Sequence, residues 1–87
     1  MADRVIGTVV FIGHDSADPD YLQVFNVNWY ASGNHSPNSP QGQAALRVDI
    51  TQNDTQITSD LKNLLAAEVN SLLGTSFNIA DIGGCSL

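Results

Sequence analysis

Hydrophobic residues recur with a helical period in only one segment of this 87-residue chain, residues 55–73. Spacings of three and four residues place them on one face of an α-helix. Those positions are Ile57, Leu61, Leu64, Leu65, Val69, Leu72 and Leu73. Asn53 or Asp54 suits the cap of the first turn, and Gly74 suits the left-handed position that ends a helix. The pattern predicts one amphipathic helix that packs on a sheet.

Three segments before this helix have the two-residue alternation of β-strands. Residues 4–12 are rich in β-branched side chains and apolar on both faces, which is typical of a central strand. Residues 21–31 also alternate, with Phe25 and Trp29 on one face. Residues 44–51 alternate most regularly and keep one face polar, as expected near the edge of a sheet.

The fourth predicted strand, residues 76–82, follows the helix and has Phe77 and Ile79 on one side. Residues 83–87 then form a flexible tail. A right-handed crossover makes this strand parallel to the third, and the first strand needs a neighbour on its open side. We therefore predict a single α+β domain spanning residues 1–87. It has two layers, a four-stranded, mostly antiparallel sheet (β-β-β-α-β, strand order 3-2-1-4) and one helix on one face.

One helix covers only one face of such a sheet, so the other face is left for a partner. In the alternation of the second strand, Leu22, Val24 and Tyr30 fall on that uncovered face. Trp29 points the opposite way, into the predicted core. Tyr30 offers an amphipathic anchor of the kind that interfaces favour. We expect self-association through this face, into a homo-oligomer or a larger assembly.

The charge balance excludes some partners. The net charge is −6, and the three cations, Arg4, Arg47 and Lys62, are scattered. Binding to nucleic acid or to an anionic membrane needs clustered cations, so we expect neither. No apolar run predicts a signal peptide or a membrane span. Uncharged polar residues outnumber charged ones by 26 to 12, which suits an extracellular or particle surface.

An acidic turn, residues 14–20, is the best candidate for a ligand site. Asp15, Asp18 and Asp20 alternate in a way that suits a hard cation such as Ca²⁺, and His14 precedes them. The spacing lacks the glycine and the terminal glutamate of an EF-hand loop. The competing interpretation is a solvated β-turn built on Asp18 and the proline that follows it.

Candidate catalytic groups are few. His14 and His35 are the residues that could act as bases at neutral pH, and neither lies in a recognisable set with a nucleophile. Cys85 is the only cysteine, so it is either an idle tail thiol or the site of an interchain disulfide. We predict no enzyme and no cofactor beyond the candidate Ca²⁺. A small hydrolase or isomerase that uses one of the histidines ranks last.

A long polar loop, residues 32–43, separates the second and third strands, and loops of this length are usually functional or disordered. Together with the uncovered apolar face and the scarcity of lysine, it resembles accessory subunits of virus or phage particles and other self-assembling structural proteins. The resemblance is to a general type. It implies a non-enzymatic structural subunit of a virion or similar assembly, with the loop as a contact arm. The alternative is a small binding module with its cation site in the turn at residues 14–20.

Overall fold

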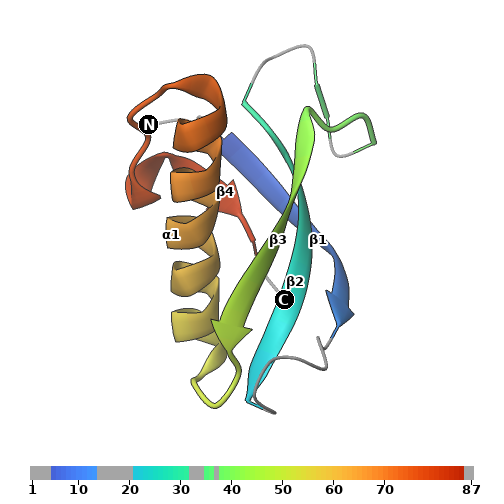
Figure 1. The fold of residues 1–87 in the computed structure, drawn as a ribbon, viewed down its shortest axis with the longest axis vertical. Coiled ribbons are helices and arrows are strands. Elements are labelled where there is room, and N and C mark those ends of the chain that lie inside the picture. The colour runs from blue at the N-terminus through green and yellow to red at the C-terminus, as the bar shows by residue number, and fades with distance from the viewer. Residues whose placement is uncertain (1–4, 14–20, 32–34, 37, 86–87) are drawn as a thin grey trace.

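The computed structural model describes residues 5–13, 21–31, 35–36 and 38–85. Its elements follow in the order β1 (Val5–Gly13), β2 (Leu22–Tyr30), β3 (Gly42–Asp49), α1 (Asp54–Leu73), the 3₁₀ helix η1 (Ile79–Asp81) and β4 (Ile82–Gly84). Figure 1 shows two layers, with α1 on one face of the sheet.

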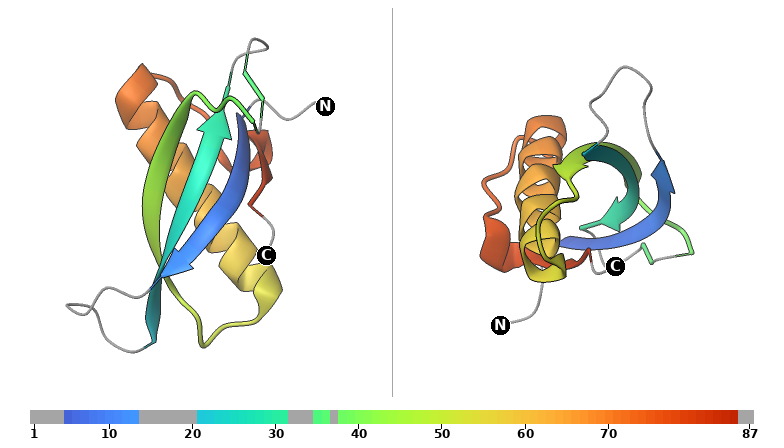
Figure 2. Two further views of the ribbon diagram at one scale, coloured as in Figure 1. Left: turned by 90° about the vertical axis from the view of Figure 1, so that its right-hand side faces the viewer. Right: turned by 90° about the horizontal axis from the view of Figure 1, so that it is seen from below.

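The strands lie side by side in the order β3-β2-β1-β4. β2 runs antiparallel to both of its neighbours, whereas β4 runs parallel to β1. β4 is therefore also parallel to β3, and α1 connects these two strands by crossing over the sheet (Figure 2). The predicted α+β class, the mostly antiparallel sheet and the strand order 3-2-1-4 are confirmed.

Alternation along β2 and β3 decides which side chains enter the layer between the sheet and α1. The buried side chains of these strands are Phe25, Val27, Trp29, Ala44, Leu46 and Val48. Trp29 is thus a core residue, as predicted, and Tyr30 lies on the opposite face. Ile50, which belongs to the predicted strand at residues 44–51, lies in the turn after β3 and is 40% exposed.

β1 does not keep one alternation along its length. Its register with β2 shifts between Val9 and Phe11, so Val10 is the extra residue of a β-bulge. The bulge reverses the two faces of the strand, and Ile12 beyond it pairs with the core residue Phe25. Unbroken alternation over the predicted strand at residues 4–12 would put Ile12 on the face opposite Val9, whereas the register puts both on the side of the core. Because residues 9–12 are all apolar, their hydrophobicity pattern could not predict the change of register at the bulge.

α1 begins and ends where its capping residues predict. The Oδ1 of Asn53 accepts a hydrogen bond from the backbone N–H of Gln56 at 2.8 Å. At the other end Gly74 has φ +66°, a conformation that costs other residues about 1–2 kcal/mol, and its N–H donates to the carbonyl oxygen of Asn70 at 2.8 Å.

The buried stripe of α1 is shorter than predicted. Its buried residues are Ile57, Leu61, Leu65, Ala66 and Val69. Leu64, Leu72 and Leu73, predicted to be on the same face, are 39%, 62% and 42% exposed. Leu72 and Leu73 are exposed because the C-terminal end of α1 extends beyond the sheet on the β3 side (Figure 2).

One amide holds the segment between α1 and β4. The Nδ2 of Asn70 donates to the carbonyl oxygen of Phe77, and its Oδ1 accepts from the N–H of the same residue, both at 2.8 Å. Phe77 packs against the core, and Asn78 then caps η1. The fourth strand lies beside β1 as predicted, but its predicted bounds, residues 76–82, are wrong. β4 begins only at the last of those residues and uses the first two residues of the predicted tail.

One row across the sheet contains three glycines and the only tryptophan. In this row Gly42 lies beside Trp29, Trp29 beside Gly7, and Gly7 beside Gly84. A Cβ on Gly42 would lie 2.7 Å from the indole Cζ2, so the ring occupies the space of that missing side chain. The indole N–H is buried and has no hydrogen-bond partner among the described residues. Shape complementarity therefore holds this ring.

Candidate interaction surface

The face of the sheet opposite α1 is the surface on which the sequence predicts an interface. Alternation places on it the side chains of β1, β2 and β3 that do not enter the core. We call it the helix-free face and define it by Ile6, Thr8, Leu22, Val24, Asn26, Asn28, Tyr30, Gln43, Ala45, Arg47 and Asp49. Each of these residues is partly or largely exposed.

Polar side chains occupy the middle of the helix-free face. Thr8, Asn28 and Gln43 form one row across three strands, and Asn26 lies on the same face two residues along β2. The Nε2 of Gln43 donates to the Oδ1 of Asn28 at 3.1 Å. An amide has two N–H donors and an acceptor oxygen, so this bond uses only some of the hydrogen-bonding groups in the row.

Apolar side chains lie at the two ends of this face. Ile6 pairs with Tyr30 at one end, and Leu22 and Val24 lie at the other end of β2. At the rise of a β-strand, about 26 Å separates Leu22 from Tyr30. The three predicted interface residues therefore share a face, as expected, but form two patches with the polar row between them.

The helix-free face carries little charge. Its charged residues, Arg47 and Asp49, are close together near the end of β3 and have opposite signs. The other acidic residues in the described part of the chain lie on α1 and η1: Asp54, Asp60, Glu68 and Asp81. Within that part of the chain, negative charge is concentrated away from this face.

Thr51 holds the carboxylate of Asp49 at the edge of the face. Its hydroxyl and its backbone N–H donate to the Oδ1 of Asp49 at 2.6 Å and 2.8 Å. The hydroxyl bond, followed by the N–H bond, lowers the pKa of Asp49 below its usual value. Asp49 is therefore ionised at neutral pH.

The predicted cation ligands Asp15, Asp18 and Asp20, together with His14, lie outside the described residues. Among residues 5–13, 21–31, 35–36 and 38–85, no three His, Cys, Asp or Glu side chains gather in a way that suits a metal ion. The cation site remains a prediction from the sequence.

The described part of the long loop contains a hydrogen-bonded turn. The backbone groups of Ser36 and Ser39 bond to each other at 2.9 Å and 3.3 Å, and the Nδ1 of His35 donates to the carbonyl oxygen of Ser39 at 3.2 Å. Gln41 closes the base of the loop, since its N–H donates to Trp29 and its Oε1 accepts from Ala31. The side chain of His35 therefore stabilises this turn. β3 begins at Gly42, two residues earlier than predicted.

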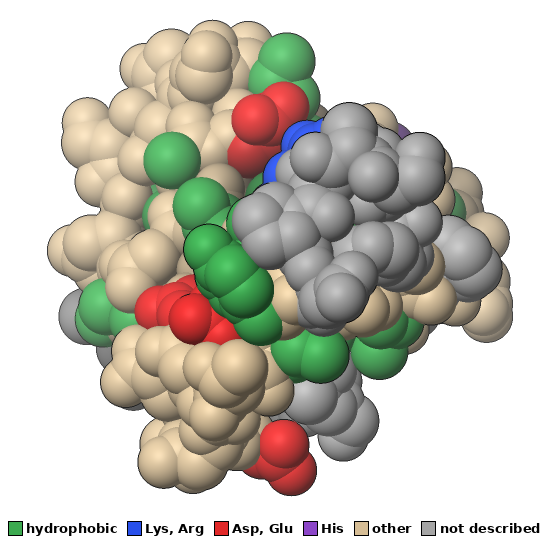
Figure 3. Space-filling model, turned by 60° about the horizontal axis from the view of Figure 1, so that its bottom comes forward, with side chains coloured by type: hydrophobic (Ala, Val, Ile, Leu, Met, Phe, Trp, Pro, Cys, Tyr) green, Lys and Arg blue, Asp and Glu red, His purple; other side chains and the backbone are tan. Residues whose placement is uncertain are grey.

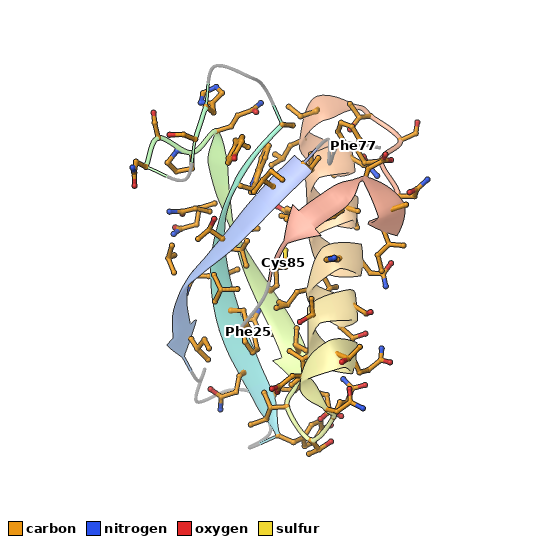
Figure 4. All side chains as sticks on the ribbon, turned by 180° about the vertical axis from the view of Figure 1, so that it is seen from behind. Phe25, Phe77 and Cys85 are labelled. Atoms are coloured by element: carbon orange, nitrogen blue, oxygen red, sulfur yellow. The ribbon has the colours of Figure 1, made fainter. Side chains whose placement is uncertain are left out.

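Cys85 lies in the core, where Figure 4 places it between the sheet and α1. Burial raises the pKa of the thiol to about 11, and the positive charge of Lys62 opposes that shift. At 1% exposure the thiol fits neither sequence interpretation, an idle tail group or an interchain disulfide. The pair of glycines before it predicted a flexible tail, whereas they form the tight approach of β4 to β1.

Sequence reasoning missed two members of the helix-free face, Thr8 and Gln43. Gln43 fell in the predicted loop, although extending the alternation of β3 backward from Ala44 places it on this face. Thr8 could have been found in the same way, because it lies two residues after Ile6 and alternation in the first strand puts both on one face.

Comparisons with protein family models, with curated proteins and with solved structures find no match. In the described part of the chain, no helix has both the length and the hydrophobicity that crossing a membrane requires.

Proposed function

We propose that this chain is a non-enzymatic structural or assembly subunit that self-associates through its helix-free face. Its amide-rich, lysine-poor composition suits an accessory protein of a virus or phage particle. The observation that carries the proposal is the make-up of that face, which has a polar amide row in the middle, an apolar patch at each end and little charge.

A second copy of the chain is the partner because the face is complementary to itself. Amides donate and accept hydrogen bonds equally well, so the row of Thr8, Asn28 and Gln43 can bond to its own copy across a two-fold axis. Each end has apolar side chains on β2, so the Tyr30 end meets apolar side chains whether it faces itself or the Val24 end. At the Val24 end, Arg47 and Asp49 of β3 lie beside Val24 and Leu22, so that end contributes one charge of each sign as well as apolar area.

Electrostatics favour this face over the other side of the molecule. Two copies with a net charge of −6 each repel one another, and the described acidic residues of α1 and η1 would add to that repulsion. On the helix-free face Arg47 and Asp49 have opposite signs. Among the charges that the structure describes, repulsion is therefore smallest when the helix layers point away from each other.

Sedimentation velocity at increasing protein concentration tests the proposal with two variants. Val24→Lys places a charge in one apolar patch of the helix-free face. Ile79→Lys is the matched control, because Ile79 is 40% exposed on η1, away from that face. We expect Val24→Lys to halve the weight-average mass at about 100 μM, a concentration well above the Kd of a specific dimer, and Ile79→Lys to leave it unchanged.

Two results contradict the proposal. One is a wild-type protein that stays monomeric at about 100 μM. The other is a Val24→Lys variant that keeps the mass of the wild type while its far-ultraviolet spectrum shows a native fold.

A further inference from the structure

β3 is an edge strand of the sheet that the structure describes. It pairs with β2 without a register shift from Gly42 to Asp49, and in the described part of the chain no strand lies on its other side. β4, at the opposite edge, has three residues. Long edge strands usually carry prolines, bulges or charged side chains that prevent pairing with another chain; β3 has no proline and no bulge, and its charged residues, Arg47 and Asp49, lie near its C-terminal end. Its edge is therefore open to a further strand.

The backbone direction of β3 follows from one hydrogen bond. The N–H of Ile50 donates to the carbonyl oxygen of Tyr21 at 2.9 Å, so even-numbered residues of β3 direct their backbone groups toward β2. Gln43 and Ala45 then direct their N–H and C=O groups toward the free edge. These are the groups with which a new strand would bond.

An exposed apolar ridge of α1 lies on the side of this edge. Leu64 and Leu72 are in one row of the helix, with the exposed Glu68 between them. Leu65 points at β1, and Lys62, on one side of Leu65 around the helix, lies toward the end of β4. Leu64 lies on the other side of Leu65 around the helix, so this ridge faces the β3 side of the sheet. Figure 2 shows that end of α1 reaching past β3, near the strand's first residues.

A second apolar patch lies on the same side of the sheet at the far end of β3. Tyr21 and Ile50 are bonded neighbours there and are 49% and 40% exposed. Alternation from Phe25 and Val48 puts both on the side of α1. Figure 3 looks at this end of the molecule and shows hydrophobic side chains gathered between the helix and the sheet.

We infer that β3 pairs antiparallel with β3 of a second copy, across a two-fold axis that passes through Ala45. The axis is perpendicular to the sheet, so it makes one eight-stranded sheet with both helices on the same face. It also sets the first residues of one β3 beside the last residues of the other. The protruding Leu72 of each copy then covers Tyr21 and Ile50 of its partner, and two apolar patches become buried in each half.

Charge selects the register. With Ala45 on the axis, Gln43 lies opposite Arg47 and the strands overlap along their whole length. A shift of the axis to Arg47 sets two like charges directly opposite each other, which destabilises a strand pair. This interface is separate from the helix-free face. A chain that uses both surfaces forms tetramers or larger assemblies.

Ala45→Pro tests the edge. It removes an N–H that points away from β2 and so leaves the hydrogen bonds of β3 with β2 in place, as for prolines found on edge strands. Leu72→Ser tests the helix contact, with Ile79→Ser as its matched control on η1. We expect Ala45→Pro and Leu72→Ser, each combined with Val24→Lys so that only the β3 edge is left to associate, to weaken dimerisation at least tenfold in sedimentation velocity, about 1.4 kcal/mol, and Ile79→Ser in the same background to leave it unchanged. The emission of Trp29 checks that each variant is folded.

Amide hydrogen exchange tests the pairing of the β3 edge in the wild-type protein. We expect exchange of the Gln43 and Ala45 N–H groups to slow about tenfold when the concentration rises from about 20 μM to 1 mM, while the N–H groups of Ala44 and Leu46 stay protected throughout. Exchange at Gln43 and Ala45 that does not depend on concentration overturns the inference. So does a dimer that survives Ala45→Pro and is lost in Val24→Lys, a result that leaves the helix-free face as the sole interface. A dimer lost only in Ala45→Pro overturns the helix-free face instead.

Discussion

The backbone N–H of Cys85 donates to the carbonyl oxygen of Gly7 at 2.9 Å, and the thiol of Cys85 fills the space that a side chain on Gly7 would need. A Cβ on Gly7 would lie 2.7 Å from that sulfur and 2.7 Å from the Cδ2 of Leu65. β1, β4 and α1 therefore meet at a single position that only glycine can occupy. This contact closes the sheet on its β4 side.

Gly7→Ala is expected to destabilise the fold by about 1–3 kcal/mol, the usual cost of overpacking a core. Urea unfolding followed by the emission of Trp29 measures the loss. Adding Cys85→Ala removes one of the two closest contacts, so the double variant should lose less than the sum of the single variants. Gly74→Ala is the control, because a Cβ there meets nothing within 4 Å and its cost arises from a positive φ alone. Strict additivity of Gly7→Ala and Cys85→Ala would contradict this account of the contact.

Asn70 is expected to stabilise the path of the chain from α1 to η1. Asn70→Ala loses both bonds to Phe77 and the bond from Thr75, so we expect a loss of about 1–3 kcal/mol in the free energy of unfolding. Asn70→Asp keeps the acceptor oxygen and lacks the donor, and it should lose less. Asn63→Ala is the matched control at an exposed position of the same helix, where alanine is at least as favourable. Equal losses at Asn63 and Asn70 would show that the amide has no special role.

The sequence predicts those features of this fold that local periodicity encodes. The helix from Asp54 to Leu73, its caps and the inward residues of β2 and β3 follow from spacings of three to four and of two residues. The strand order follows from the need of an apolar strand for two neighbours. These features depend on neighbours in the chain or on burial alone.

The wrong predictions depend on contacts between distant residues. The bulge at Val10 is a property of backbone pairing in a run that is apolar throughout. β4 starts later than predicted because the side-chain amide of Asn70 bonds to the backbone N–H and C=O of Phe77, seven positions away along the chain. Leu72 is exposed because α1 crosses the sheet at an angle and its C-terminal end extends past the last strand (Figure 2). The helical period of the sequence does not predict where the sheet ends. The helix-free face was foreseen as a surface, but its polar middle depends on the register of β2 with β3.

Asp49 should titrate below the usual 3.8 of its side chain because Thr51 bonds to the ionised form. Removing the hydroxyl with Thr51→Val should raise the pKa of Asp49, while the bond from the backbone N–H keeps part of the shift. A folded-state pKa below the unfolded value gives a contribution to stability that is present above about pH 3.8 and is lost as pH falls through the folded-state pKa. Carboxyl titration by NMR of both proteins measures the shift. A pKa that is the same in both would contradict the role of the hydroxyl.

Cys85 should make the fold less stable in alkaline solution. The thiol ionises at about 9.0 when exposed, and burial raises its pKa in the folded protein to about 11. Between these values the unfolded chain loses a proton that the folded chain keeps, so the contribution of Cys85 to stability is complete below pH 9.0 and is lost as pH rises toward 11. The Cys85→Ala variant has no thiol at this position and so lacks this dependence of stability on pH. We therefore expect the wild type to be more stable than Cys85→Ala at about pH 8, because its core is better packed, and the difference in stability to shrink at about pH 10.5. Urea midpoints of both proteins at the two pH values measure this. An advantage that does not change with pH would show that the thiol ionises as readily in the folded protein as in the unfolded chain.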